Sequence, residues 1–269
     1  MERWGVGVEN FQPLPLRQYS LIIITSIMKK TCLQFLLLFC AIQLAAQTKD
    51  PKDTEVWTPE PRVVTPGTMG SPPSDAIVLF DGKNFDEWTV EGKAAKPGWL
   101  IKDGTMTVVK ETGNIATKRS FGDCQLHVEF RTPAPEGEGQ GRSNSGVFLQ
   151  SRYEVQVLDS YQNRTYSNGQ AGAMYKQSIP LVNACRPPGE WQTYDIFFTA
   201  PRFNADGIRV APGRITVVHN GVLIQHNVEI QGTTEYIGLP KNIAHGNAPI
   251  VLQDHGNPVS YRNIWIREL

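Results

Sequence analysis

The sequence has few cysteines, no excess of either charge and no long apolar run. Its 269 residues include four cysteines, and 26 basic residues balance 26 acidic ones. Neither half carries a basic stripe with interleaved aromatic residues, so nucleic acid is not an expected partner. The longest apolar run, from Leu33 to Leu44, falls short of the roughly 20 residues that span a membrane. We therefore expect no stable membrane anchor in the mature protein.

The segment after Met28 has the layout of a secretory signal peptide. Two lysines follow the methionine, then the apolar run, then the small residues Ala45 and Ala46. This order predicts a signal peptide over residues 28–47 and an exported protein, periplasmic or extracellular. Residues 1–27 carry no usable pattern, and we expect them to be a non-native extension from a start codon placed too early.

Only Cys124 and Cys185 lie outside the predicted signal peptide. In an oxidising compartment they can pair, but the sequence does not place them within bonding distance, so a disulfide and two free thiols both remain open. The sequence also lacks C-x-x-C and H-E-x-x-H patterns, and it therefore does not predict a dedicated zinc site.

Residues 48–74 are rich in proline and predict an extended linker, because proline removes a backbone donor and disfavours the α conformation at the residue before it. Val63 and Val64 indicate that part of this linker packs along the domain surface. Residues 75–269 are long enough for one β-rich domain with a sizeable core.

From residue 75 onward almost every apolar run is short and β-like, and no stretch has a convincing helical period. The Asn220-Gly221 pair between RITVVH and VLIQHN predicts a tight hairpin. Many short strands joined by turns predict an all-β fold, a two-sheet antiparallel sandwich. The expected strands are 76–79, 99–102, 105–109, 115–117, 124–131, 145–150, 153–158, 191–199, 214–219, 222–228, 250–254 and 261–268.

The segment YEVQVLD, residues 153–159, places an acid and an amide on one face of a predicted strand. Similar polar positions recur on other strands, and together they suit sugar hydroxyls, which both donate and accept hydrogen bonds. We expect them to line one concave groove, with a merely solvated sheet face as the alternative. The set is Glu129, Arg131, Gln150, Glu154, Gln156, Gln253 and His255, with Arg142, Asn144 and Ser145 from the glycine-rich loop. Trp191 is the best candidate for a sugar-stacking ring, and Tyr161 and Tyr175 for a groove wall.

From about Asp75 to Leu269 the chain resembles the 3-keto-disaccharide hydrolase family, formerly a domain of unknown function. The resemblance rests on LFDGKNFDEW, FGDCQLHVEFR, SNSGVFLQSRYEVQVLDSY, PPGEWQTYDI, ITVVHNG and PIVLQDHGNPVSYRNIWI, in that order. It implies a jelly roll of the concanavalin A-like lectin/glucanase type, export, and action on glycosides whose C3 hydroxyl has been oxidised to a ketone.

YEVQVLD also resembles the paired-carboxylate strand of laminarinase-type glucanases, with two departures. Gln156 cannot ionise, and Asp159 lies five residues after Glu154, which in a regular strand means the opposite face at about 16 Å. A retaining glycosidase needs its carboxyls about 5–5.5 Å apart. Only a β-bulge near Leu158 would turn Asp159 inward, so an ordinary double-displacement mechanism is disfavoured.

Cleavage of a keto-sugar does not require two closely spaced carboxyls, since the ketone acidifies the C2 hydrogen and allows elimination followed by hydration. Our hypothesis makes Glu154 the base or a metal ligand and His255 the acid or a ligand, with Asp159 as a further catalytic candidate. Substrate contacts are assigned to Arg131, Asn144, Gln150, Gln156, Gln253 and Trp191. A divalent cation stays possible, with unknown ligands. The alternative function is a non-catalytic, lectin-like carbohydrate-binding module.

Overall fold

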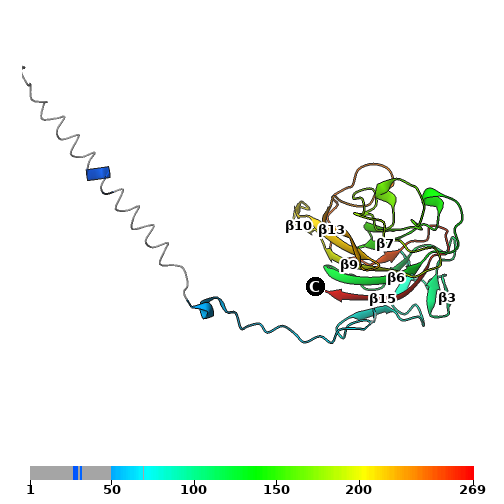
Figure 1. Cartoon of the computed structure of the whole chain (residues 1–269), viewed down its shortest axis with the longest axis horizontal. Coiled ribbons are helices and arrows are strands. Elements are labelled where there is room, and N and C mark those ends of the chain that lie inside the picture. The colour runs from blue at the N-terminus through cyan, green and yellow to red at the C-terminus, as the bar shows by residue number, and fades with distance from the viewer. Residues whose placement is uncertain (1–26, 30, 32–49, 69) are drawn as a thin grey trace, which may run out of the picture. The chain divides into compact units, whose positions relative to one another are not determined.

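The computed structural model describes residues 27–29, 31, 50–68 and 70–269 (Figure 1). Most of the predicted signal peptide and upstream extension therefore lies outside the described residues. The chain divides into two compact units, Met1–Arg62 and Val63–Leu269. In the first unit a short 3-10 helix, η1, covers Pro51–Thr54. None of the described helices is both long and apolar enough to cross a membrane.

The larger of two main sheets has eight strands in the second unit. Seven follow the order β13-β12-β9-β6-β15-β4-β3, and β1 pairs with β15 beside that path. All these pairings are antiparallel. The strands are β1 (Ile77–Phe80), β3 (Leu100–Lys102), β4 (Thr105–Thr107), β6 (Cys124–Arg131), β9 (Gln192–Thr199), β12 (Gly213–His219), β13 (Val222–Ile230) and β15 (Ser260–Glu268).

The smaller main sheet has five strands in the order β2-β5-β14-β7-β8. They are β2 (Trp88–Val90), β5 (Ile115–Thr117), β14 (Val251–Leu252), β7 (Ser145–Leu149) and β8 (Tyr153–Val157), all antiparallel. A separate ribbon pairs β10 (Arg202–Phe203) with β11 (Arg209–Ala211). Two further 3-10 helices, η2 (Gly139–Gly141) and η3 (Ser167–Gly169), lie in loops.

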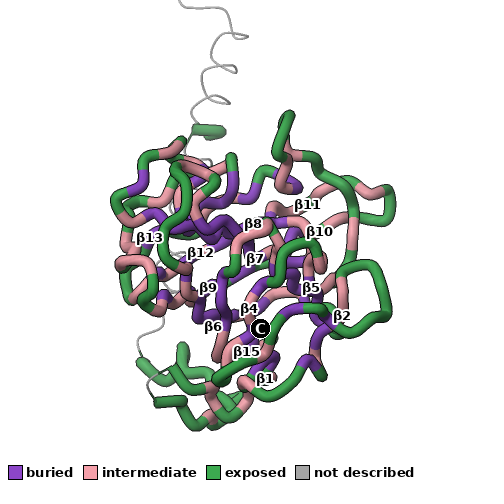
Figure 2. Tube along the Cα trace, turned by 90° about the vertical axis from the view of Figure 1, so that its right-hand side faces the viewer, coloured by how far each residue is buried: buried purple, intermediate pink, exposed green. Residues whose placement is uncertain are grey.

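The two sheets bury one apolar core between them, and the predicted all-β sandwich is confirmed. On β8, Tyr153, Val155 and Val157 belong to this core, so Glu154 and Gln156 point to the outward face of the smaller sheet. Each large apolar side chain moved from water into the core contributes about 1.5–3 kcal/mol. Figure 2 shows the buried residues concentrated on the central strands of both sheets.

The strongest hairpin prediction is confirmed. Asn220 and Gly221 have φ angles of 52° and 82°, as a type I′ turn requires, and they connect His219 to Val222 in register. Three short strands, β2, β10 and β11, were not predicted, because two or three residues are too few to produce a visible alternation.

The end of the predicted linker and the first residue of the domain contact the larger sheet. Asp75, the first domain residue, forms an ion pair with Arg267, with Nε and Oδ1 2.8 Å apart. The Gly70 carbonyl accepts hydrogen bonds from Asn263 Nδ2 at 2.9 Å and Trp265 Nε1 at 3.0 Å. Cys124 and Cys185, whose pairing the sequence left open, are both free thiols in this structure.

Candidate active site

A pocket of about 580 Å³ lies over the outward face of β7, β8 and the end of β14. Volumes in the range of about 300–1,000 Å³ are typical of small-molecule sites. Four residues that the sequence singled out for this groove meet here: Asn144, Glu154, Gln253 and His255. Their neighbours in the wall are Gln140, Gly141, Phe148, Tyr166, Tyr175, Lys176, Thr234 and Tyr236.

Glu154 is the buried carboxyl of this pocket, with only 4% of its surface exposed. Its space is provided by Gly146 on the neighbouring strand. A Cβ atom on Gly146 would lie 2.7 Å from Glu154 Oε1 and 2.9 Å from the Phe148 ring. Glycine at this position therefore lets the carboxyl lie flat against the sheet. No sequence motif marks Gly146, because its role depends on pairing between β7 and β8.

Burial raises the pKa of Glu154 to about 8. In the described part of the chain no side chain or backbone group donates a hydrogen bond to this carboxyl, so nothing there offsets the cost of removing its charge from water. The carboxyl is therefore mostly protonated at neutral pH and can exchange a proton near pH 8. That is the property required of a general acid or base.

Gln140, in η2, connects the pocket to the strand below it. Its Nε2 donates to Thr165 Oγ1 at 3.1 Å and to Gly169 O at 2.8 Å. Its Oε1 accepts from Gln156 Nε2 at 3.0 Å. Gln156 itself is fully buried beneath Gln140 and does not line the pocket. The sequence correctly placed Gln156 on this face, but the structure makes it a support for Gln140.

Gln253 and His255 reach the pocket from the segment after β14. Gln253 is fixed by its backbone, whose N–H donates to Gly146 O at 3.0 Å and whose carbonyl accepts from Ser145 Oγ at 2.6 Å. The next residue, Asp254, accepts from the N–H of Gly113 at 3.0 Å. These bonds hold the segment firmly, while His255 remains exposed at the pocket mouth.

The opposite wall is built from tyrosines around a lysine. The Lys176 ammonium lies 4.3 Å from the Tyr236 ring centroid and 5.7 Å from the rings of Tyr166 and Tyr175. The hydroxyls of Tyr166 and Tyr175 are 2.6 Å apart. Lys176 has a φ of +58°, which is uncommon for a residue with a side chain and often marks a functional position. Tyr175, which the sequence predicted as a groove wall, lies in this wall. Lys176 was not predicted, because a single lysine outside any motif gives no signal in the sequence.

Asp159 does not join Glu154, and its prediction as a catalytic residue is wrong in its geometry. Its Oδ2 pairs with Arg142 Nε at 2.6 Å, and its Oδ1 accepts from the N–H of Tyr161 at 3.1 Å. Asp159 is 2% exposed and does not line the pocket. Arg142, also expected in the groove, is occupied by the same ion pair. No bulge turns Asp159 inward, because β8 ends at Val157.

Three residues predicted to contact substrate lie elsewhere, so the expectation of a single groove is corrected. Arg131 ends β6 of the larger sheet, and its guanidinium lies 4.7 Å from the Trp191 ring centroid. Arg262 lies over the same ring at 4.1 Å, so two cations already engage this ring. Gln150 is buried, donates to Phe121 O at 3.0 Å, and belongs to another cavity of about 410 Å³.

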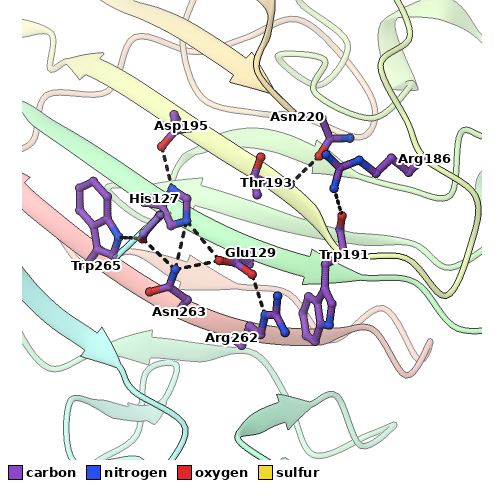
Figure 3. Close-up of polar contacts among 11 residues, drawn as sticks. His127, Glu129, Arg186, Trp191, Thr193, Asp195, Asn220, Arg262, Asn263 and Trp265 are labelled. Atoms are coloured by element: carbon purple, nitrogen blue, oxygen red, sulfur yellow. Dashed lines mark hydrogen bonds and ion pairs between the residues drawn. The ribbon is translucent and has the colours of Figure 1, made fainter. Parts of the chain in front are cut away.

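The outward face of the larger sheet carries a second polar cluster, shown in Figure 3. Glu129 accepts from Arg262 Nε at 2.6 Å and from Asn263 Nδ2 at 2.8 Å. His127 lies 2.7 Å from Asp195 through Nδ1 and 3.7 Å from Glu129 through Nε2. Burial opposes charge on Glu129, but the nearby His127 and the hydrogen bonds from Asn263 and Arg262 outweigh it and lower its pKa to about 2. This glutamate is therefore charged at neutral pH.

The described residues include no group of three or more histidine, cysteine or acidic side chains arranged to hold a metal ion. Within the pocket, the donors suited to a divalent cation are the Glu154 carboxyl, the His255 imidazole and the Gln253 amide oxygen. This set is smaller than that of a closed structural metal site.

Comparisons with known proteins identify relatives of this chain. A curated relative, the 3-keto-disaccharide hydrolase of Bacteroides thetaiotaomicron, is 25% identical over 240 residues, or 72% of this chain and 78% of its own length. A solved structure of a candidate glycosyl hydrolase from Parabacteroides distasonis is 52% identical, with a TM-score of 0.79 over 82% of this chain and 97% of that one.

A second solved structure from Parabacteroides distasonis, also a candidate glycosyl hydrolase, shares the fold at 19% identity. Its TM-score is 0.53 over 72% of this chain and 94% of that one. The family model described as a 3-keto-alpha-glucoside-1,2-lyase-like domain matches residues 75–267. The chain therefore belongs to the 3-keto-alpha-glucoside-1,2-lyase-like family.

Proposed function

We propose that this protein cleaves the glycosidic bond of 3-keto-glycosides, including 3-keto-disaccharides, by proton abstraction at C2, elimination and hydration. The proposal rests on the buried Glu154 carboxyl, whose pKa is raised to about 8 in a pocket large enough for a sugar. Membership in a family of keto-glucoside lyases and hydrolases supplies the substrate class.

In the first step the Glu154 carboxylate takes the C2 proton, and the electron pair of the C–H bond forms an enolate with the C3 carbonyl. The enolate then expels the C1 substituent, whose oxygen receives a proton from the His255 imidazolium or from water. The product is an unsaturated 3-keto sugar. Addition of water, with OH at C1 and H at C2, completes net hydrolysis. A base with a pKa near 8 is strong enough for this step and still partly ionised at neutral pH.

The remaining pocket residues are assigned to binding and to stabilisation of the enolate. Asn144 and Gln253 provide amide groups, which donate to and accept from sugar hydroxyls. Gln253 Oε1 is buried without a donor among the described residues, and a substrate hydroxyl would supply one. Lys176 adds a positive charge to the same wall, which favours the negative enolate oxygen.

Two further predictions belong to this proposal. In the alternative arrangement a divalent cation would be held by Glu154, His255 and the Gln253 amide oxygen in place of their proton-transfer roles, and it would polarise the ketone. Export would follow from the predicted signal peptide, and N-terminal sequencing of the protein from the cell envelope should give a start near Gln47 or Thr48. Recovery of uncleaved protein from the cytoplasm alone would contradict export.

The purified protein should be incubated with 3-keto-trehalose and, in parallel, with trehalose, with and without EDTA. We expect release of glucose and 3-keto-glucose only from the oxidised sugar, with kcat/KM rising with pH until about pH 8. Loss of turnover in EDTA, restored by Mn²⁺, would support the cation. Saturable sugar binding without turnover of either substrate would contradict the enzyme and support the lectin-like alternative.

A further inference from the structure

A larger cavity, of about 1160 Å³, lies at the β2 edge of the smaller sheet and shares no lining residue with the candidate active site. It is formed by the loop before β2, the loop between β2 and β3, and the residue after β5. Most of the loop residues around it are exposed, as Figure 2 shows beside β2. Neither the family nor the proposed reaction assigns this cavity a role.

The cavity has a strong excess of positive charge. Its charged lining residues are Lys83, Lys93, Lys96, Lys118 and Asp86. Lys83 forms an ion pair with Asp81 at 2.5 Å. Across the described ranges, no carboxylate lies within ion-pair distance of the other three ammonium groups. Three uncompensated cations around one concave surface attract an anion more strongly than isolated surface lysines do.

The loop that carries Lys93 and Lys96 is held in place by Thr89 on β2. The Thr89 hydroxyl donates to Lys93 O at 2.6 Å and accepts from Ala95 N–H at 3.2 Å. Lys118 is fixed at its backbone, where its N–H donates to Glu87 O at 2.9 Å. The backbone positions of Lys93 and Lys118 are therefore set before a ligand arrives, which reduces the entropy cost of binding.

The floor of the cavity is apolar and aromatic. It includes atoms of Phe85, Trp88 and Trp99. The indole N–H of Trp88 donates to Leu79 O at 2.7 Å, and that of Trp99 donates to Gly113 O at 3.0 Å. Both donors are used inside the protein, and both rings belong to the core, with 1% and 4% of their surface exposed. The apolar surface open to a ligand comes from Ala94, Ala95 and Ile101. Apolar surface beside charged groups suits the two-sided character of a sugar ring.

The cavity lies at the β2 edge of the smaller sheet, and its residue Thr89 is on the same face as Glu154, whereas the neighbouring Trp88 faces the core. The register pairs Thr89 with Ala116, Ala116 with Val251, Val251 with Phe148 and Phe148 with Glu154. Thr89 lines the cavity, and Glu154 lines the pocket. Four steps between neighbouring strands correspond to about 19 Å. This separation is within the reach of a short oligosaccharide.

We propose that the lysine-lined cavity is a second binding site for an anionic saccharide, one that carries carboxylate or sulfate groups. The lysines bind the anionic groups, and the apolar side chains between them contact the apolar face of a sugar ring. Binding at this site does not involve Glu154, so it can be tested independently of the proposed cleavage.

The test measures binding of trigalacturonate and of a sulfated κ-carrageenan tetrasaccharide by calorimetry and tryptophan fluorescence, with maltotetraose as the neutral comparison. We expect at least one anionic saccharide to bind saturably. The variant Lys93→Gln/Lys96→Gln/Lys118→Gln should weaken that binding about tenfold or more, equivalent to about 1.4 kcal/mol. Comparing the affinities of the carboxylated and the sulfated saccharide then shows which anionic group the cavity binds.

The matched control is Lys52→Gln/Lys102→Gln/Lys110→Gln, which removes the same charge from exposed positions outside the cavity. It should leave binding unchanged, and so should Glu154→Gln. Equal weakening in the two triple variants would overturn the proposal, because it would show a general charge effect. Equal binding of maltotetraose, equal binding of inorganic sulfate, or no binding of either anionic saccharide would also overturn it.

Discussion

Two glutamates on outward sheet faces, Glu129 and Glu154, are both buried, yet their pKa values shift in opposite directions. Glu129 is 8% exposed and accepts hydrogen bonds from Arg262 and Asn263, with His127 beside it. Its pKa falls to about 2. Glu154 is 4% exposed, and its carboxyl receives no hydrogen bond from the described residues. Its pKa rises to about 8.

The difference shows that burial alone does not identify a reactive group. The Glu129 charge is stabilised by its partners and cannot take part in proton transfer near neutral pH. Glu154 lacks such partners and is kept in a pocket, where a substrate can provide them. Residues with strongly shifted pKa values in pockets are candidates for catalysis, whereas the same shifts in closed ion-pair networks indicate a structural role.

The largest effect is expected from Glu154→Gln. The substitution keeps the shape of the side chain but removes the proton-transfer group, so kcat/KM for 3-keto-trehalose should fall about 10²- to 10⁴-fold. Binding of the substrate, measured by calorimetry, should remain within a few-fold of the parent. Turnover that survives in this variant would contradict the role given to Glu154.

Substitution of Glu129 is expected to lower stability and to leave activity unchanged. Glu129→Gln removes the central charge of a partly buried network, in which the Arg262 side chain is 42% exposed, so it should lower the free energy of unfolding by about 1–3 kcal/mol. Below the melting temperature, the folded variant should retain the parent's kcat/KM, since Glu129 lies on the other sheet. Denaturant titration and activity measured on the same preparation separate the two effects. A loss of turnover without a loss of stability would place Glu129 in the reaction.

The buried Glu154 carboxyl should make the stability of the protein depend on pH. Glu154 has a folded-state pKa above its unfolded value near 4.5, so the unfolded state loses this proton first and stability falls as pH rises from about 4.5 to 8. Glu154→Gln removes this loss, and at pH 8 the variant should be more stable than the parent by about 4 kcal/mol. At pH 4 the two proteins should have equal stability. A variant that is less stable at pH 8 would show that the Glu154 charge is compensated.

The smallest of these effects is expected from Gly146→Ala. The added methyl would lie 2.7 Å from Glu154 Oε1, so the carboxyl must rotate away from its position. We expect kcat/KM to fall about tenfold, equivalent to about 1.4 kcal/mol, with unfolding free energy lowered by about 1–3 kcal/mol. Gly246→Ala is the control, because Gly246 lies outside this pocket and a Cβ there meets no atom within 4 Å. Equal effects in the two variants would contradict the spatial role of Gly146.

The sequence predicted local features of this fold correctly, but it did not predict which distant strands pair. The alternation in YEVQVLD correctly placed Glu154 outward, and Asn220-Gly221 correctly marked a hairpin. The same alternation in LHVEFR placed Arg131 outward as well, but on the larger sheet. Periodicity gives the face that a side chain occupies within its strand. Which sheet the strand joins depends on non-local pairing that no short motif encodes.

The candidate site was predicted in part for the same reason. Asn144, Glu154, Gln253 and His255 lie in strongly patterned strands or directly beside them, and they do meet in one pocket. Lys176, by contrast, comes from a long segment without periodic residues, and its position depends on tertiary contacts with tyrosine rings. Asp159 was attractive by analogy with a glucanase strand, and its ion pair with Arg142 follows from the loop fold.

The most direct test of this account is the pKa of Glu154 in the folded protein. It can be measured by NMR titration of side-chain-carboxyl ¹³C-labelled glutamate, with the Glu154 and Glu129 signals assigned through Glu154→Gln and Glu129→Gln. We predict a midpoint near pH 8 for Glu154 and near pH 2 for Glu129. A Glu154 midpoint at or below about 4.5, the value of an ordinary solvated glutamate, would contradict the account.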